Sequence, residues 1–177
     1  ADDDHADHQG GHAEVPGGGG GALTVWRGGL VFAGDDGVHG RELWTSDGTV
    51  TGTVMVKDIY SGTSSSTPGN FTQVNGTLFF RAADADHYRE LWKSDGTEAC
   101  TVLVKDIWPG PEGSYPEHLR NISGTLFFRA EDPDHGVEVW RSDGTESGTV
   151  LVQDLNPGPD NGNPLIHSAL LRGGVLF

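Results

Sequence analysis

The chain is poor in several residue types, and each shortage excludes a class of protein. Its 177 residues include one cysteine, so no intrachain disulfide can form. Only 34% of the residues are hydrophobic. No apolar run approaches the roughly 18–20 residues of a membrane-spanning helix, so we expect no membrane insertion. The 28 glycines and the short apolar runs instead favour short strands and tight turns.

Basic residues are also scarce. The chain has 11 lysines and arginines against 26 aspartates and glutamates, which gives a formal net charge of −15. This balance argues against nucleic acid as a partner, because its binders carry basic patches. We interpret the acidity mainly as a feature that keeps a repetitive β-protein in solution. It also suits a cation-rich exterior, such as sea water or a calcium-bearing cell surface.

Residues 1–21 differ in composition from the rest of the chain. They are rich in aspartate and histidine and end in the glycine run Gly17–Gly21. With almost no apolar side chains, the segment cannot offset the entropy of ordering, so we predict a disordered arm. His5, His8 and His12 could bind a transition metal loosely, but we favour a solvated tail.

The strongest signal in the chain is an octapeptide that occurs three times. Glu42–Thr49 returns as Glu90–Thr97 and as Glu138–Thr145, at a constant spacing of 48 residues. A strict period of this size indicates a modular architecture. Because no 3.6-residue periodicity is present, the repeated unit is not helical.

The pattern of each unit predicts four short antiparallel strands followed by a crossover. In the second unit, Asn75-Gly76 between two apolar runs is a strong hairpin signal, because a type I′ turn needs positive φ at both central residues. Four-stranded units at this period predict an all-β fold of β-propeller blades. The expected arrangement is an arm over residues 1–21, then a repeat region over 22–177 with blades at 22–69, 70–117 and 118–165 and a partial blade at 166–177.

About three and a half blades cannot close a ring, since propellers use roughly four to eight. Either the natural protein continues beyond Phe177 or several chains close the ring together, and we favour continuation. An open array would expose apolar strand edges and invite association.

The motif Glu-Leu-Trp-x-Ser-Asp-Gly-Thr, followed by Gly-Thr and Val-Lys-Asp-Ile, resembles the bacterial ELWxxDGT repeat family over roughly residues 22–177. Departures include Val139 in place of Leu, Tyr88 in place of Gly, and Cys100 where other units have Gly52 and Gly148. The resemblance implies a secreted, propeller-like scaffold. It implies no established enzyme activity or ligand.

Several polar positions recur in all three units, including Glu42, Asp47 and Asp58 with their counterparts. A catalytic site is needed once, so residues kept in every unit more often serve the unit itself. By analogy with WD-repeat propellers, we predict that an Asp, a His, a Ser and a Trp lock the turns together. This structural network comprises Asp36, His39, Trp44 and Ser46, then His87, Trp92 and Ser94, then His135, Trp140 and Ser142.

An alternative hypothesis is that the acidic loops bind calcium. Calcium takes six to eight oxygen ligands, and these loops place carboxylates close together on turns. No EF-hand or nonapeptide calcium motif is present, so calcium is only a candidate cofactor. The candidate ligands are Asp36, Asp84, Asp86, Asp132 and Asp134.

Aromatic residues at strand starts and crossovers suggest a carbohydrate ligand, because aromatic faces stack on sugars and repeated weak sites add avidity. The candidates are Trp26, Tyr60, Trp108 and Tyr115.

No nucleophile elbow, His-Glu-x-x-His motif or phosphate loop is present, so we expect no enzyme activity; a propeller hydrolase or lyase is a more remote alternative. The sequence therefore predicts an extracellular or cell-surface module for binding, adhesion or self-assembly. Its partner would be a protein, a glycan, a matrix polymer or another copy of the chain. The main alternative is a calcium-stabilised, lectin-like propeller.

Overall fold

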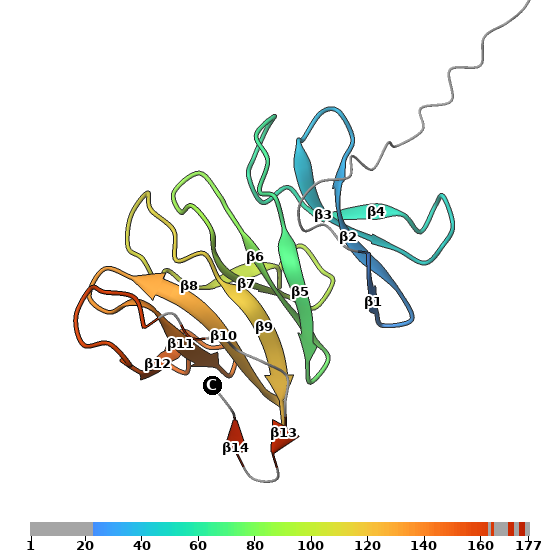
Figure 1. Ribbon diagram of the computed structural model, residues 1–177. Helices are drawn as coiled ribbons and strands as arrows, with labels where there is room; N and C mark the ends of the chain where they lie inside the picture. Colours follow the sequence, from blue (N-terminus) through green and yellow to red (C-terminus); the bar gives the residue numbers. More distant parts are fainter. Residues whose placement is uncertain (1–22, 163, 165–169, 172–173, 176–177) are drawn as a thin grey trace, which may run out of the picture.

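The computed structural model describes residues 23–162, 164, 170–171 and 174–175. These residues form strands and turns without any helix, which confirms the all-β prediction. Twelve strands make three four-stranded antiparallel sheets that follow one another along the chain (Figure 1). The predicted arm over residues 1–21 and most of the predicted partial blade lie outside the described residues.

Within each sheet the strands pair in sequence order. Sheet 1 contains β1 (Thr24–Trp26), β2 (Gly29–Asp35), β3 (Arg41–Ser46) and β4 (Val54–Lys57). Sheet 2 contains β5 (Gly69–Val74), β6 (Thr77–Ala82), β7 (Glu90–Ser94) and β8 (Val102–Lys105). Sheet 3 contains β9 (Glu117–Ile122), β10 (Thr125–Asp132), β11 (Gly136–Ser142) and β12 (Val150–Gln153). A short pair, β13 (Leu170–Leu171) and β14 (Gly174–Val175), follows.

The first hairpin of each sheet has the turn that the sequence predicts. At Asn75-Gly76 the φ angles are 49° and 85°, so both central residues are left-handed, as a type I′ turn requires. Arg27-Gly28 and Ser123-Gly124 adopt the same conformation without an asparagine. The position in the repeat therefore determines this turn even where the residue type is less favourable.

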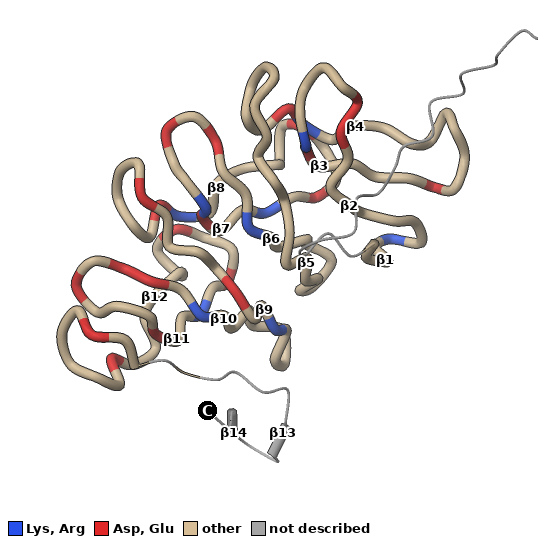
Figure 2. Tube along the Cα trace, turned by 45° about the horizontal axis from the view of Figure 1, so that its top comes forward, with Lys and Arg blue, Asp and Glu red and all other residues tan. Residues whose placement is uncertain are grey.

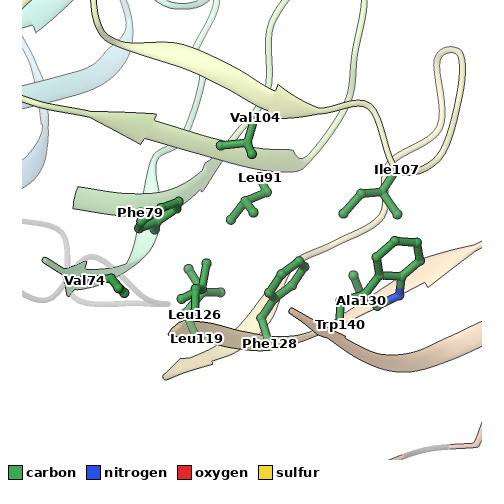
Figure 3. Close-up of a cluster of buried hydrophobic side chains, with 10 residues drawn as sticks. All are labelled: Val74, Phe79, Leu91, Val104, Ile107, Leu119, Leu126, Phe128, Ala130 and Trp140. Carbon is green, nitrogen blue, oxygen red and sulfur yellow. The ribbon is translucent and has the colours of Figure 1, made fainter. Parts of the chain in front are cut away.

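The sheets pack face to face through two apolar cores built from the same positions of the repeat. Between sheets 2 and 3, Phe79 and Leu91 of one sheet meet Leu126 and Phe128 of the other (Figure 3). Moving 48 residues back gives the core between sheets 1 and 2, where Val31 and Leu43 meet Leu78 and Phe80. Among the described residues, sheet 2 thus packs on sheet 1 through one face and on sheet 3 through the other.

Polar contacts repeat across the two interfaces as well. The Lys57 ammonium donates to the Thr101 carbonyl at 2.9 Å, and the Lys105 ammonium donates to the Thr149 carbonyl at 3.1 Å. Sheets 2 and 3 approach most closely at their first strands, β5 and β9, which lie side by side (Figure 1).

Candidate functional site

The glutamate that opens the octapeptide is fully buried in each of the three units. Glu42 lies on β3 and is fully buried. Its carboxylate accepts hydrogen bonds from the Ile59 amide at 2.9 Å and from both the amide and the hydroxyl of Ser66, at 2.9 and 2.6 Å. The side chain therefore ties its own sheet to the crossover that leads into the next one.

Glu90 repeats this arrangement with one more donor. It accepts from the amides of Ile107, Trp108 and Ser114 at 3.1, 3.2 and 2.8 Å, and from the Ser114 hydroxyl at 2.5 Å. Burial raises the pKa of Glu90 to about 7, and the four hydrogen bonds limit that rise. Burial also raises the pKa of Glu42.

Glu138 is equally buried but differs from its two counterparts. Neither carboxylate oxygen has a hydrogen-bond partner in the part of the chain that the structure describes. The serine that serves Glu42 and Glu90 is replaced by Gly162, where an added Cβ would lie 2.0 Å from Oε1 of Glu138. The third crossover thus lies close to the Glu138 carboxylate, but it has no serine hydroxyl at this position to donate to that carboxylate.

Most acidic side chains lie in loops rather than within the sheets (Figure 2). In the first such loop, Asp36 accepts from the amides of Val38 and His39, both at 2.9 Å, and binds Nδ1 of His39 at 2.7 Å. The His39 amide and ring lower the pKa of Asp36 to about 2, and the carboxylate raises the pKa of His39. The predicted Asp–His pairing is therefore present in this exposed turn.

The same aspartate–histidine turn occurs in the other two units. Nδ1 of His87 lies 2.9 Å from Asp84, and Nδ1 of His135 lies 2.9 Å from Asp132. Asp86 and Asp134 contribute backbone amides to these turns, donating to Asp84 and Asp132. The carboxylates of Asp36, Asp84 and Asp132 are thus engaged in local hydrogen bonds.

A second aspartate approaches this histidine from the end of the fourth strand. Nε2 of His87 lies 3.8 Å from Asp106. Asp58, Asp106 and Asp154 each have one buried oxygen for which no described residue is a hydrogen-bond partner. Among the described residues, however, no group of three or more His, Cys, Asp or Glu is arranged to hold a metal ion. Calcium binding therefore stays a prediction.

The serine of the expected lock belongs to a separate set of contacts. Ser46 shares a hydrogen bond of 2.6 Å with Thr53 and accepts from the Gly48 amide at 3.1 Å. Asp47 accepts from the Thr49 hydroxyl at 2.7 Å and so closes the turn. Ser94 and Ser142 make the equivalent bonds to Thr101 and Thr149, both at 2.7 Å.

The tryptophans do not complete a four-residue network in the described residues. Trp92 and Trp140 lie in the apolar cores at 5% exposure, and Trp44 is half-buried. The indole nitrogens of all three are buried without a partner. In the described residues the Asp, His and Ser positions thus form an Asp–His turn and a Ser–Thr turn, and the Trp position is a core residue in units 2 and 3.

Of the four aromatics expected on a binding rim, only one is well exposed. Trp26 is a correction: it is 5% exposed and belongs to the core between sheets 1 and 2, because its face of β1 is covered by sheet 2. Tyr60 and Trp108 are half-buried, whereas Tyr115 is 39% exposed. The sequence reasoning missed the neighbour of Tyr115: the ring of Tyr88 lies 5.6 Å away.

The sequence places Glu42 and Glu90 among the recurring positions that serve the unit, but it does not reveal their burial or their partners. Their recurrence is visible, but an isolated glutamate in a strand is usually a surface residue.

Comparison with protein-family models, curated proteins and solved structures gave no match to this chain. The described residues include no helix of the length and apolarity needed to cross a bilayer.

Proposed function

We propose that the chain is a β-propeller-type repeat scaffold, secreted or on the cell surface, that acts as a binding, adhesion or self-assembly module. The observation that carries this proposal is the exact correspondence of the two inter-sheet cores, which marks each 48-residue unit as one interchangeable layer. Four-stranded layers in sequence order are the building plan of propeller blades. The close approach of β5 and β9 supports an arrangement in which sheets 2 and 3 radiate from their first strands.

The recurring polar groups support a scaffold rather than an enzyme. Glu42 and Glu90 are consumed by crossover amides and serines, and Asp36 and Ser46 by their own turns. Groups held in this way stabilise each unit, and the hydrogen bonds already made by Glu42, Glu90, Asp36 and Ser46 do not favour a role in catalysis. No unit is singled out by such chemistry among the described residues.

A retention assay tests the proposed binding role. Beads that carry the folded chain are expected to be retained on at least one of three surfaces: a matrix polysaccharide, a fibrous extracellular protein, or a layer of the chain itself. Beads that carry heat-unfolded chain serve as the control. Equal, background-level retention on all three surfaces would contradict the proposal.

Carbohydrate binding is a second candidate function, and one feature of the second unit favours it. Tyr88 stands where the other units have Gly40 and Gly136, and the residue is 45% exposed. It meets Tyr115 edge to face, and the Arg89 guanidinium lies 5.5 Å from its ring centre. This is an aromatic surface with a polar rim, the kind of surface that stacks on a sugar ring.

The crossover that packs beside this tyrosine differs from that of unit 1. In unit 1, the Arg41 amide donates to the Ser65 hydroxyl at 2.9 Å. In unit 2 the serine becomes Gly113, where a Cβ would lie 2.6 Å from the Arg89 nitrogen. Unit 2 thus loses one side-chain acceptor and gains an exposed aromatic pair. Beside Tyr115 lies a cleft of about 240 Å³ that is also lined by Glu117, Arg129 and Glu131.

A glycan array, read with calcium and with chelator, tests this candidate. Tyr88→Gly restores the residue of the other units, and Tyr115→Ala removes the exposed ring. Both variants are expected to lose binding, whereas Val38→Ala, at another exposed site, should retain it. An array without any signal for the parent chain would exclude this second function.

A further inference from the structure

The outer face of sheet 1 corresponds to half of an interface, and no described sheet packs on it. The residues of sheet 2 that pack onto sheet 1 include Leu78 and Phe80, which are fully buried. Their counterparts on sheet 1 are Leu30 and Phe32, which are only half-buried. Leu23 and Val25 of the same face are 63% and 75% exposed. Together the face presents Leu23, Val25, Leu30, Phe32, Trp44 and Met55.

The complementary half lies at the opposite end of the array. The side of sheet 2 that receives sheet 3 includes Val104 and Ile107, each 5% exposed. The corresponding residues of sheet 3 are Val152 and Leu155, at 37% and 49% exposure. Both end faces therefore expose apolar side chains, and such a surface can be buried by a binding partner.

We propose that the sheet 1 face of one copy of this chain docks onto the sheet 3 face of a second copy, in a head-to-tail contact. The inference rests on the proposed repeat scaffold. Two copies of the required interface already exist inside the chain, and the two end faces carry its two halves at the same repeat positions. Such a contact is heterologous, so it continues into a ring or a filament instead of stopping at a symmetric dimer.

The position occupied by Lys57, Lys105 and Gln153 predicts that the contact between copies is weaker than the internal interfaces. Lys57 and Lys105 each donate to a threonine carbonyl of the following sheet. The third unit has Gln153 at this position, and its amide donates instead to the neighbouring Asp154 carbonyl at 3.0 Å. The contact between copies therefore lacks the charged hydrogen bond of the internal interfaces. Gln153→Lys would supply it, opposite the Thr53 carbonyl of the second copy.

Complementation between two face variants tests the head-to-tail geometry. The first variant, Leu23→Asp with Val25→Asp, disrupts the sheet 1 face. The second, Val152→Asp with Leu155→Asp, disrupts the sheet 3 face. Val38→Asp with Val50→Asp is a control of equal charge, because these side chains lie in turns at 60% and 93% exposure. Sedimentation velocity over a concentration series, at 0.15 M salt or above to screen the net charge, gives the oligomeric state.

The parent chain and the control are expected to associate with rising concentration, and each face variant alone to stay monomeric. An equimolar mixture of the two face variants should form a one-to-one complex, because each retains the half that the other lacks. Gln153→Lys should tighten association of the parent about tenfold, the effect of one charged hydrogen bond. Thermal melting of each variant establishes that it is folded.

Three results would overturn the inference. The first is a parent chain that is monomeric throughout, the second is association that survives both face variants, and the third is a mixture that fails to combine. Any of these would leave bead retention on the polysaccharide and on the fibrous protein, and so the proposed binding role toward other surfaces, unaffected.

Discussion

Phe80 and Phe32 occupy the same position of successive units, yet Phe80 is fully buried and Phe32 is only half-buried. The difference is not in the residue but in its neighbour, since sheet 1 covers Phe80 and no described sheet covers Phe32. The inner and outer faces therefore carry the same apolar repeat positions. On the inner faces a neighbouring sheet covers these positions, and on the outer faces no described sheet does. This comparison indicates that each unit encodes two half-interfaces and that a neighbouring unit completes them.

The largest expected effect separates the two faces directly. Phe80→Ala should lower the free energy of unfolding by about 3–5 kcal/mol, because it leaves a cavity in a packed core. Phe32→Ala should cost less than half as much, because the ring is already partly hydrated. Urea titration of both variants at a concentration that keeps the chain monomeric measures the difference. Equal losses would show that the outer face is as well packed as the inner one.

The pH dependence of stability should report the buried Glu90. Its pKa is raised in the folded state from 4.5 to about 7, so the folded protein binds this proton more tightly than the unfolded chain does. Protonated Glu90 therefore contributes its full stabilisation below pH 4.5. As pH rises to 7, the free energy of unfolding should fall by about 3 kcal/mol at most. Unfolding titrations across this window should show the decline, and Glu90→Gln should flatten it. A slope that the variant leaves unchanged would assign the effect to other groups.

The crossover serine should stabilise the unit that has it. Ser114→Ala removes a buried hydroxyl that donates to the Glu90 carboxylate and is expected to cost about 1–3 kcal/mol. In the third unit, Gly162→Ala should also destabilise the protein, but through a clash with Glu138. Thermal melting of both variants, with exposed Ser61→Ala as the control, measures this. A stabilising Gly162→Ala would show that the third crossover does not approach the carboxylate.

The lysine between sheets should contribute only where a following sheet exists. Lys105→Gln gives the second unit the residue of the third and should cost about 1 kcal/mol, for one partly exposed hydrogen bond. The reverse change, Gln153→Lys, should leave the melting temperature of the monomer unaltered. If both changes shift the melting temperature alike, net charge and not the carbonyl contact is responsible.

The sequence predicted those features of the fold that the period determines. The strand order, the Asn75-Gly76 turn and the Asp–His pairing all follow from local residue patterns that recur. It failed where burial depends on a partner segment distant in sequence. Trp26 was expected on a rim, but sheet 2 covers its face of β1. Glu90 is stabilised in the interior by the amides of a crossover 17 to 24 residues away, which no local pattern reveals.

The exposure of one repeat position in three units tests the central claim most directly. Leu78 and Leu126 are fully buried between sheets, whereas their counterpart Leu30 on the outer face is half-buried. Each is replaced singly by cysteine in a Cys100→Gly background, which gives the second unit the glycine of the others. Thiol labelling under native conditions should be fast at position 30 and slow, by orders of magnitude, at positions 78 and 126. Equal labelling rates at the three positions would contradict stacked units with unpartnered outer faces.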